Sequence, residues 1–132
     1  MHATPKDIRD PQAGPAPIDR KVLDQYREID PSGGPGLAHR IVRIYIDSAA
    51  ETLRQIEQAI AGRNPEALRQ ATHSLKSSTA SIGAVSLADL FRELEAMAKA
   101  ARIDDAAVLF DEARHEYERV LVALRDLLAE AP

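Results

Sequence analysis

Hydrophobic residues recur every three or four positions along most of the chain, which is the spacing of one face of an α-helix. Four long stripes of this kind predict four long helices, the first over about residues 37–61. The stripes are, in chain order, Val42, Ile46, Ala49, Leu53, Ile56 and Ile60; Leu68, Ala71, Thr72, Leu75, Thr79 and Ile82; Leu87, Leu90, Phe91, Leu94, Met97 and Ala101; and Phe110, Ala113, Tyr117, Val120, Leu124 and Leu127. No segment alternates with a period of two, so we expect no strands.

The ends of the predicted helices carry local signals. Gly62 stops the first long helix, and Asn64 followed by Pro65 is a good N-cap and first-turn pair for the second. Gly83 falls at the end of the second helix, where a glycine is common. Asp104 is predicted to cap the start of the fourth helix.

A shorter stripe between Ile18 and Ile29 predicts a short amphipathic helix, which the stretch PSGGPG ends. Together with the four long helices and their short connections, it predicts an all-α fold. We expect an up-and-down antiparallel four-helix bundle with a short extra N-terminal helix packed on one end.

The start of the chain differs from the rest in composition, because residues 1–17 hold four of the eight prolines. That density prevents a helix and predicts a disordered, proline-rich linker or tail. The helical bundle domain is then expected over residues 18–130.

Composition excludes several classes of site. The 132 residues include no cysteine, which rules out disulfides, thiolate catalysis, zinc–thiolate sites and iron–sulfur clusters. A net charge of −4 gives no basic footprint for nucleic acid. Because no apolar run approaches the roughly 20 residues needed to span a bilayer and no signal peptide is visible, we expect a cytoplasmic chain without membrane contact.

The second helix contains an unusual polar face, within the stretch ATHSLKSSTASIGA. His73 lies about 200° around the helix from the core residue Leu75, so we expect its imidazole to face solvent. The residues that share this face are Arg69, Gln70, Lys76, Ser77 and Ala80.

Two cations beside His73 disfavour the protonated imidazole and leave a nucleophilic ring nitrogen near neutral pH. Arg69 and Lys76 are then available for an anionic group on that nitrogen, and a phosphoryl group fits. Composition and spacing alone favour the alternative of an ordinary surface histidine. A metal site is not expected, because His39 and His115 lie on other helices without a metal-binding spacing.

The stretch HSLKSSTASIGAVSLADLFRELE resembles the signature of histidine-containing phosphotransfer (HPt) domains, and the similarity extends over about residues 18–128. One departure matters, because Ser77 stands where the family usually has glycine. On the preceding helix, Tyr45 stands where the family often has phenylalanine. The matching residues are His73, Leu75, Lys76, Ser78, Gly83, Ala84, Leu87, Leu94 and Glu95.

The resemblance implies that His73 receives and donates the phosphoryl group and that Lys76 stabilises it. It also implies that Gly83 and Ala84 form the tight junction into the third helix, although simple helix capping explains most of their presence. The geometry of the helix adds four receiver-docking candidates, which are Arg69, Gln70, Ser77 and Ala80.

The chain contains no nucleotide-binding motif, so we expect a phosphoryl carrier that has no kinase activity of its own. No cofactor is expected in this chain. Phosphoryl transfer depends mainly on positioning and charge neutralisation. A partner receiver domain would supply the aspartate and the Mg²⁺.

Three functional hypotheses follow. The first is a monomeric carrier that takes phosphate from one receiver and passes it to another. The proline-rich tail, and the end of the chain soon after the last helix, favour a carrier that is the C-terminal domain of a hybrid sensor kinase. The second is an unphosphorylated helical adaptor that docks receivers. The third is the dimerisation-phosphotransfer part of a histidine kinase, which is disfavoured because too few residues follow the motif to form an ATP-binding domain.

Overall fold

The structure is a computed structural model that describes residues 16–130, and these residues form helices and no strand. The predicted all-α bundle is confirmed. Most of the predicted tail lies outside the described residues. The helices are α2 (Arg20–Ile29), α3 (Gly36–Ala61), α4 (Pro65–Ser81), α5 (Val85–Lys99) and α6 (Ile103–Ala129).

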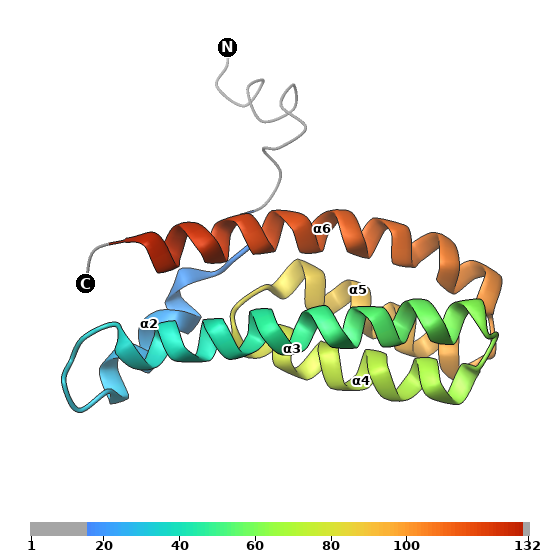
Figure 1. Cartoon of the computed structure of the whole chain (residues 1–132), viewed down its shortest axis with the longest axis horizontal. Coiled ribbons are helices and arrows are strands. Elements are labelled where there is room, and N and C mark those ends of the chain that lie inside the picture. The colour runs from blue at the N-terminus through green and yellow to red at the C-terminus, as the bar shows by residue number, and fades with distance from the viewer. Residues whose placement is uncertain (1–15, 131–132) are drawn as a thin grey trace, which may run out of the picture.

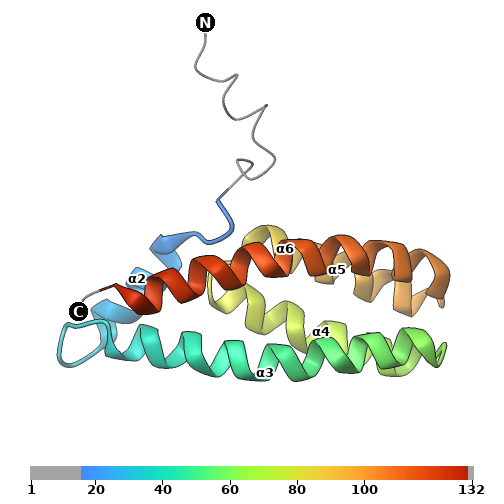
Figure 2. The same ribbon diagram turned by 45° about the horizontal axis from the view of Figure 1, so that its top comes forward.

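The four long helices run antiparallel along one axis (Figures 1 and 2). Around the bundle α3 packs against α4, α4 against α5, α5 against α6, and α6 against α3. The contact between α4 and α5 is the most extensive, and that between α3 and α6 is the sparsest. The short α2 lies at the end of the bundle where α3 begins and α6 ends (Figure 1).

The predicted stripes of α4 and α6 are buried along their whole length. In α3 the prediction is correct for Val42, Ala49 and Ile56, but Ile46, Leu53 and Ile60 are only partly buried. The buried side of α3 also includes Ala38, Tyr45 and Ala59, and the Tyr45 hydroxyl lies 2.8 Å from that of Thr79 on α4. The reason is that α3 packs more closely against α4 than against α6, which one helix's own pattern does not reveal.

The connection between α5 and α6 differs from the prediction. Helix α5 ends at Lys99, and Ala101 lies beyond it, exposed and with a φ of 58°. Helix α6 begins at Ile103, so Asp104 lies in its first turn and does not cap it. The Asp104 carboxylate instead accepts a hydrogen bond of 2.9 Å from Arg63. The start was misplaced because the buried Ile103 already belongs to the helix.

Helix α2 ends at Ile29, where the predicted stripe ends, but it begins after Ile18. Ile18 is buried but precedes the helix, Asp19 is the N-cap, and Ile29 is 68% exposed. The Asn64 cap of α4, in contrast, is confirmed, because its side chain accepts a hydrogen bond from the backbone N–H of Ala67.

Gly83 joins α4 to α5 beneath α2. Its φ of 83° is costly for residues with a side chain. A Cβ at this position would lie 2.6 Å from the backbone oxygen of Asp19, whose N–H donates to the Gly83 carbonyl at 2.8 Å. Tyr26 adds a hydrogen bond of 2.8 Å to the Ser81 carbonyl. Gly83 therefore allows α2 to pack on the end of α4, which goes beyond helix capping.

Candidate functional site

His73 lies in the middle of α4 and its side chain is 59% exposed. Its sequence neighbours Thr72 and Leu75 are almost completely buried in the core. Their burial fixes the rotation of α4 and leaves the His73 side chain facing solvent. The imidazole therefore stands at the surface of a helix that is held rigidly by its neighbours.

A buried carboxylate from α5 contacts this imidazole. The side chain of Glu95 is only 6% exposed, and its Oε2 lies 2.9 Å from Nδ1 of His73. The other carboxylate oxygen, Oε1, accepts a hydrogen bond of 2.8 Å from Lys76. The ammonium group of Lys99, one turn further along α5, lies 3.8 Å from Oε2. Both oxygens of the buried carboxylate thus have cationic or N–H partners.

These partners decide the charge of Glu95. Burial raises the pKa of its carboxyl group, but hydrogen bonds from Lys76 and His73 and the charges of Lys76 and Lys99 together lower it more. The net pKa lies below the usual value for glutamate, so Glu95 is ionised at neutral pH.

The ionised carboxylate fixes the tautomer of the imidazole. A carboxylate can only accept hydrogen bonds, so Nδ1 of His73 carries the proton and donates a hydrogen bond to Oε2 of Glu95. This assignment follows from the hydrogen-bond network. In the neutral ring, Nε2 then keeps its lone pair and is available as a nucleophile.

The two cations predicted beside His73 are not free. Arg69 donates two hydrogen bonds to Glu66, at 2.9 and 2.7 Å. Lys76 is bound to Glu95 and its side chain is only 28% exposed. The sequence predicted two cations beside an exposed imidazole, and the structure adds a carboxylate partner for each of them. The Glu95 partner comes from a different helix, so the pattern of α4 alone does not reveal it.

The other predicted docking residues share the outer side of α4 with His73. Gln70, Ser77 and Ala80 are exposed, and Arg69 is partly buried. Gln70 donates a hydrogen bond of 3.1 Å to Glu66. Ser77 and Ala80, which follow His73 on this side, have small side chains that project little from the helix.

Glu95 and Lys99 were missed as site residues. Glu95 lies 22 positions from His73 in sequence, and the resemblance to the family signature gives it no role beyond a matching position. A glutamate placed directly after a core leucine was the available signal. Its contact with the histidine depends on how α5 is rotated against α4, which the sequence does not show.

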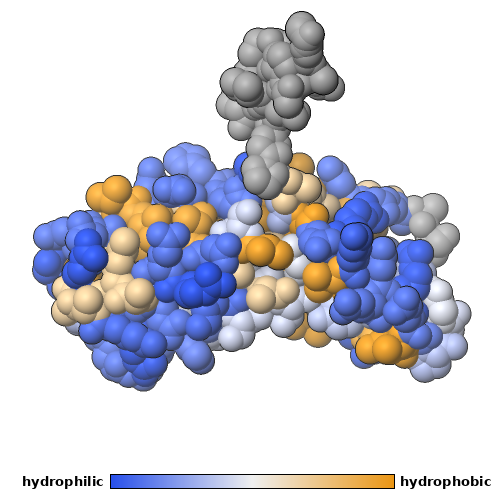
Figure 3. Space-filling model, turned by 180° about the vertical axis from the view of Figure 1, so that it is seen from behind, coloured by the Kyte–Doolittle hydropathy of each residue, from blue (hydrophilic) through white to orange (hydrophobic). Residues whose placement is uncertain are grey.

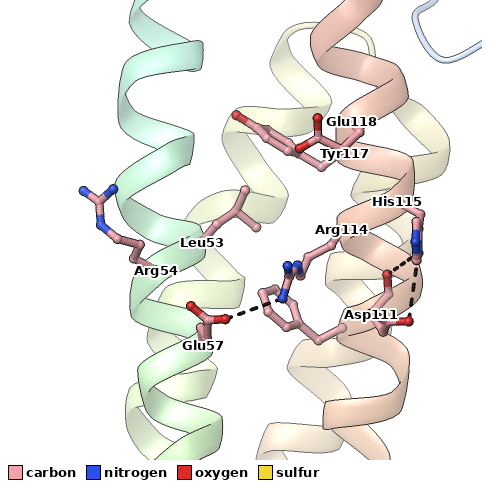
Figure 4. A pocket seen from close by; sticks show the side chains of 9 residues that line it. Leu53, Arg54, Glu57, Asp111, Arg114, His115, Tyr117 and Glu118 are labelled. Atoms are coloured by element: carbon pink, nitrogen blue, oxygen red, sulfur yellow. Dashed lines mark hydrogen bonds and ion pairs between the residues drawn. The ribbon is translucent and has the colours of Figure 1, made fainter.

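A separate groove of about 320 Å³ lies between α3 and α6, on the opposite side of the bundle from the α4–α5 pair (Figure 4). It contains none of the predicted site residues. Several of its polar groups are paired within the groove: Arg114 with Glu57 at 3.5 Å, and His115 Nδ1 with the Asp111 carbonyl at 2.9 Å. The groove follows from the sparse packing between these two helices.

The surface of the described residues offers no second obvious site. Seen from behind, hydrophobic residues form separate patches on a largely hydrophilic face (Figure 3). Within residues 16–130 no group of acidic or histidine side chains is arranged to hold a metal ion. No helix in this range is both long and apolar enough to cross a membrane.

Comparison with known proteins places this arrangement in a family. The family model described as Hpt domain matches residues 40–131, and this segment includes the whole His73–Glu95 site. The chain belongs to the Hpt domain family. The resemblance seen in the sequence is thereby confirmed.

A solved structure supports the fold of this Hpt domain. Histidine-containing phosphotransfer protein B (HptB) from Pseudomonas aeruginosa PAO1 is 24% identical, with a TM-score of 0.80. The similarity covers 90% of this chain and 99% of that one. No curated protein matches the sequence.

Membership of the family gives the general activity. Hpt domains carry a phosphoryl group on histidine within two-component phosphorelays and interact with receiver domains, so this chain is a histidine phosphotransfer domain. Such domains are phosphoryl carriers and not kinases.

Proposed function

We propose that His73 is the phosphorylated residue and that its Nε2 accepts the phosphoryl group from the aspartyl phosphate of a receiver domain. The observation that carries this proposal is the hydrogen bond from Nδ1 to the buried carboxylate of Glu95, at 2.9 Å. It leaves the lone pair on the ring nitrogen that is not engaged with α5.

In the transfer step, the Nε2 lone pair attacks phosphorus and the bond from phosphorus to the receiver's carboxylate oxygen breaks. The bonding electrons return to that carboxylate, so no external acid is needed. Holding the nucleophile in one orientation is the main requirement of such a step. The close packing of α4 against α5 supplies that rigidity.

Lys76 is proposed to stabilise the transferred phosphoryl group while it stays bound to Glu95. Its ammonium group has further N–H donors besides the one used at 2.8 Å on Glu95. Lys76 lies one turn after His73, so these donors are on the correct side of the helix. The Mg²⁺ that neutralises the rest of the charge would come from the receiver.

The receiver is proposed to dock over the outer side of α4, on Arg69, Gln70, Ser77 and Ala80. The small side chains after His73 support close approach of a second protein. We also propose that the domain passes its phosphoryl group to a second receiver, as a monomer in the cytoplasm. The proline-rich composition of residues 1–17 supports a linker to an upstream part of a hybrid sensor kinase.

The deciding experiment is transfer from phosphorylated receivers to the parent chain and to two variants. His73→Gln should accept no label, while His115→Gln, which alters an exposed histidine on α6, should accept as much as the parent. Circular dichroism should be unchanged in both. Label retained by His73→Gln would overturn the assignment. Receiver binding without any labelling of the parent would instead support the adaptor hypothesis.

A further inference from the structure

The contact between His73 and Glu95 also bears on the phosphorylated state. When Nε2 attacks phosphorus, no proton leaves the ring, so the product is a phosphoimidazolium that still carries hydrogen on Nδ1. That positive ring lies directly against the negative, 6%-exposed side chain of Glu95. Because the carboxylate is buried, the attraction between the two charges is stronger than between two fully hydrated groups.

We propose that Glu95 is a positioning residue that retains the Nδ1 proton on phospho-His73 and thereby keeps the phosphoryl group transferable. This inference rests on the proposed phosphorylation of His73. Its consequence is that the carboxylate of α5 sets the pH range over which the loaded domain can donate.

The state of Nδ1 decides the leaving group. When the phosphorus–Nε2 bond breaks, its electrons return to Nε2. If Nδ1 carries its proton, the leaving group is neutral imidazole, which is a good one. If that proton has been lost, the leaving group is an imidazolate anion, and the bond is much harder to break. The phosphoryl group can therefore be transferred readily only while Nδ1 keeps its proton.

Glu95 can fulfil this role because it does not take the proton itself. Lys76 of α4 and Lys99 of α5 both face its carboxylate, at 2.8 and 3.8 Å. These charges favour the ionised form, so Glu95 remains a hydrogen-bond acceptor while the ring is positive. The next charged groups are already paired with others, Arg69 with Glu66 and Arg92 with Asp89.

Lys76 and Lys99 have the opposite effect to Glu95 on the protonation of the phosphorylated imidazole. Each cation near a positive imidazolium disfavours it, and the carboxylate favours it. Lys99 is the more convenient of the two to remove, because its side chain is 62% exposed and its contact is long. Changes at Glu95 and Lys99 should therefore shift ring protonation in opposite directions.

Three variants test this pair of effects. Glu95→Gln keeps an oxygen that can accept from Nδ1 but removes the charge. Lys99→Gln removes the opposing charge without touching the hydrogen bond. Glu57→Gln removes an acidic charge from the α3–α6 groove and serves as a matched control for net charge.

The experiment uses phosphoramidate, a small phosphoryl donor, so that no receiver is needed. His73 is loaded, and the phosphorus NMR shift and the hydrolysis rate of the phosphoryl group are followed against pH. In Glu95→Gln the midpoints of both pH profiles should move down by about one pH unit or more. The reason is that the negative charge in contact with the imidazolium has been removed. Lys99→Gln should move them up by a smaller amount, and Glu57→Gln should leave them in place.

Coincident profiles for the parent, Glu95→Gln and Lys99→Gln would overturn the inference. Shifts of the same sign in Glu95→Gln and Lys99→Gln would overturn it too. If phosphoramidate labels a residue other than His73, the proposed function fails as well. If His73 is labelled and the profiles shift as expected but no receiver accepts the group, the inference stands and the proposed exchange with receivers fails.

Discussion

The hydroxyl groups of Tyr45 and Thr79 lie 2.8 Å apart inside the bundle and join α3 to α4. Both residues are buried, Tyr45 to 3% and Thr79 to 0% exposure. Burial also raises the pKa of Tyr45, so its hydroxyl remains protonated. This buried hydrogen bond fixes the axial position of α4, the helix of His73, along α3.

Removing one member of the pair should be costly. Tyr45→Phe leaves the Thr79 hydroxyl without its partner, and we expect unfolding free energy to fall by about 1–3 kcal/mol. Thr79→Val should cost a similar amount, whereas the double variant should recover part of the loss because no hydroxyl is left unpaired. Urea unfolding of the four proteins measures the coupling. Strictly additive losses would show that the two hydroxyls do not interact.

Gly83 provides a second stability prediction with an internal control. Gly83→Ala places a Cβ 2.6 Å from the Asp19 oxygen in a backbone conformation with φ of 83°. Gly33→Ala meets only the φ penalty, since no atom lies within 4 Å of its Cβ. We expect about 1–2 kcal/mol for Gly33→Ala and clearly more for Gly83→Ala. Equal losses in melting experiments would mean that α2 does not pack on Gly83 as described.

Lys76→Ala should affect both stability and transfer. The change removes the hydrogen-bond partner of one oxygen of the buried Glu95 carboxylate, so we expect a loss of about 1–3 kcal/mol in unfolding free energy. Phosphoryl acceptance should also slow by roughly ten- to a hundredfold, because one charge-assisted contact is lost. Lys99→Ala, at a longer and more exposed contact, is the control and should change stability by less than about 0.5 kcal/mol. Equal effects of the two variants would contradict this ranking.

The sequence predicted some of these features and not others. The stripes of α4 and α6 were predictable because each helix has one clearly hydrophobic side. In α3 the choice between Tyr45 and Ile46 depends on which neighbour packs more closely. The Glu95 contact and the Asp19–Gly83 contact join residues from different helices or turns, so they depend on rotation and docking that local patterns do not encode.

The ion pairs of Glu95 should make stability depend on pH in the acid range. Its pKa is lower in the folded chain than its ordinary value, so its contribution is fully present above about pH 4.3, the usual unfolded value. The contribution is lost as the pH falls through the folded pKa. The stability difference between the parent and Glu95→Gln should therefore shrink as the pH falls below about 4.3. A difference that stays constant over this range in chemical unfolding would contradict the lowered pKa.

The last prediction concerns Ser77, which stands where Hpt domains usually have glycine. It is exposed, lies one turn after His73, and its hydroxyl is 3.5 Å from the His73 carbonyl. Ser77→Gly should keep full transfer and lower stability by about 0.5 kcal/mol, because glycine is the poorer helix former. Ser77→Leu should fold normally, since the side chain faces solvent, but it should raise the low surface that a receiver must cross.

Receiver affinity and melting temperature, measured on both Ser77 variants, separate docking from folding. Val108→Leu is a matched control, because Val108 is 75% exposed and lies on α6, outside the proposed docking residues. Weaker binding of Ser77→Leu alone, with an unchanged melting temperature, would place the receiver over the outer side of α4. If Ser77→Leu binds and accepts phosphate like the parent, the receiver must reach Nε2 of His73 from the α5 side, past Lys99.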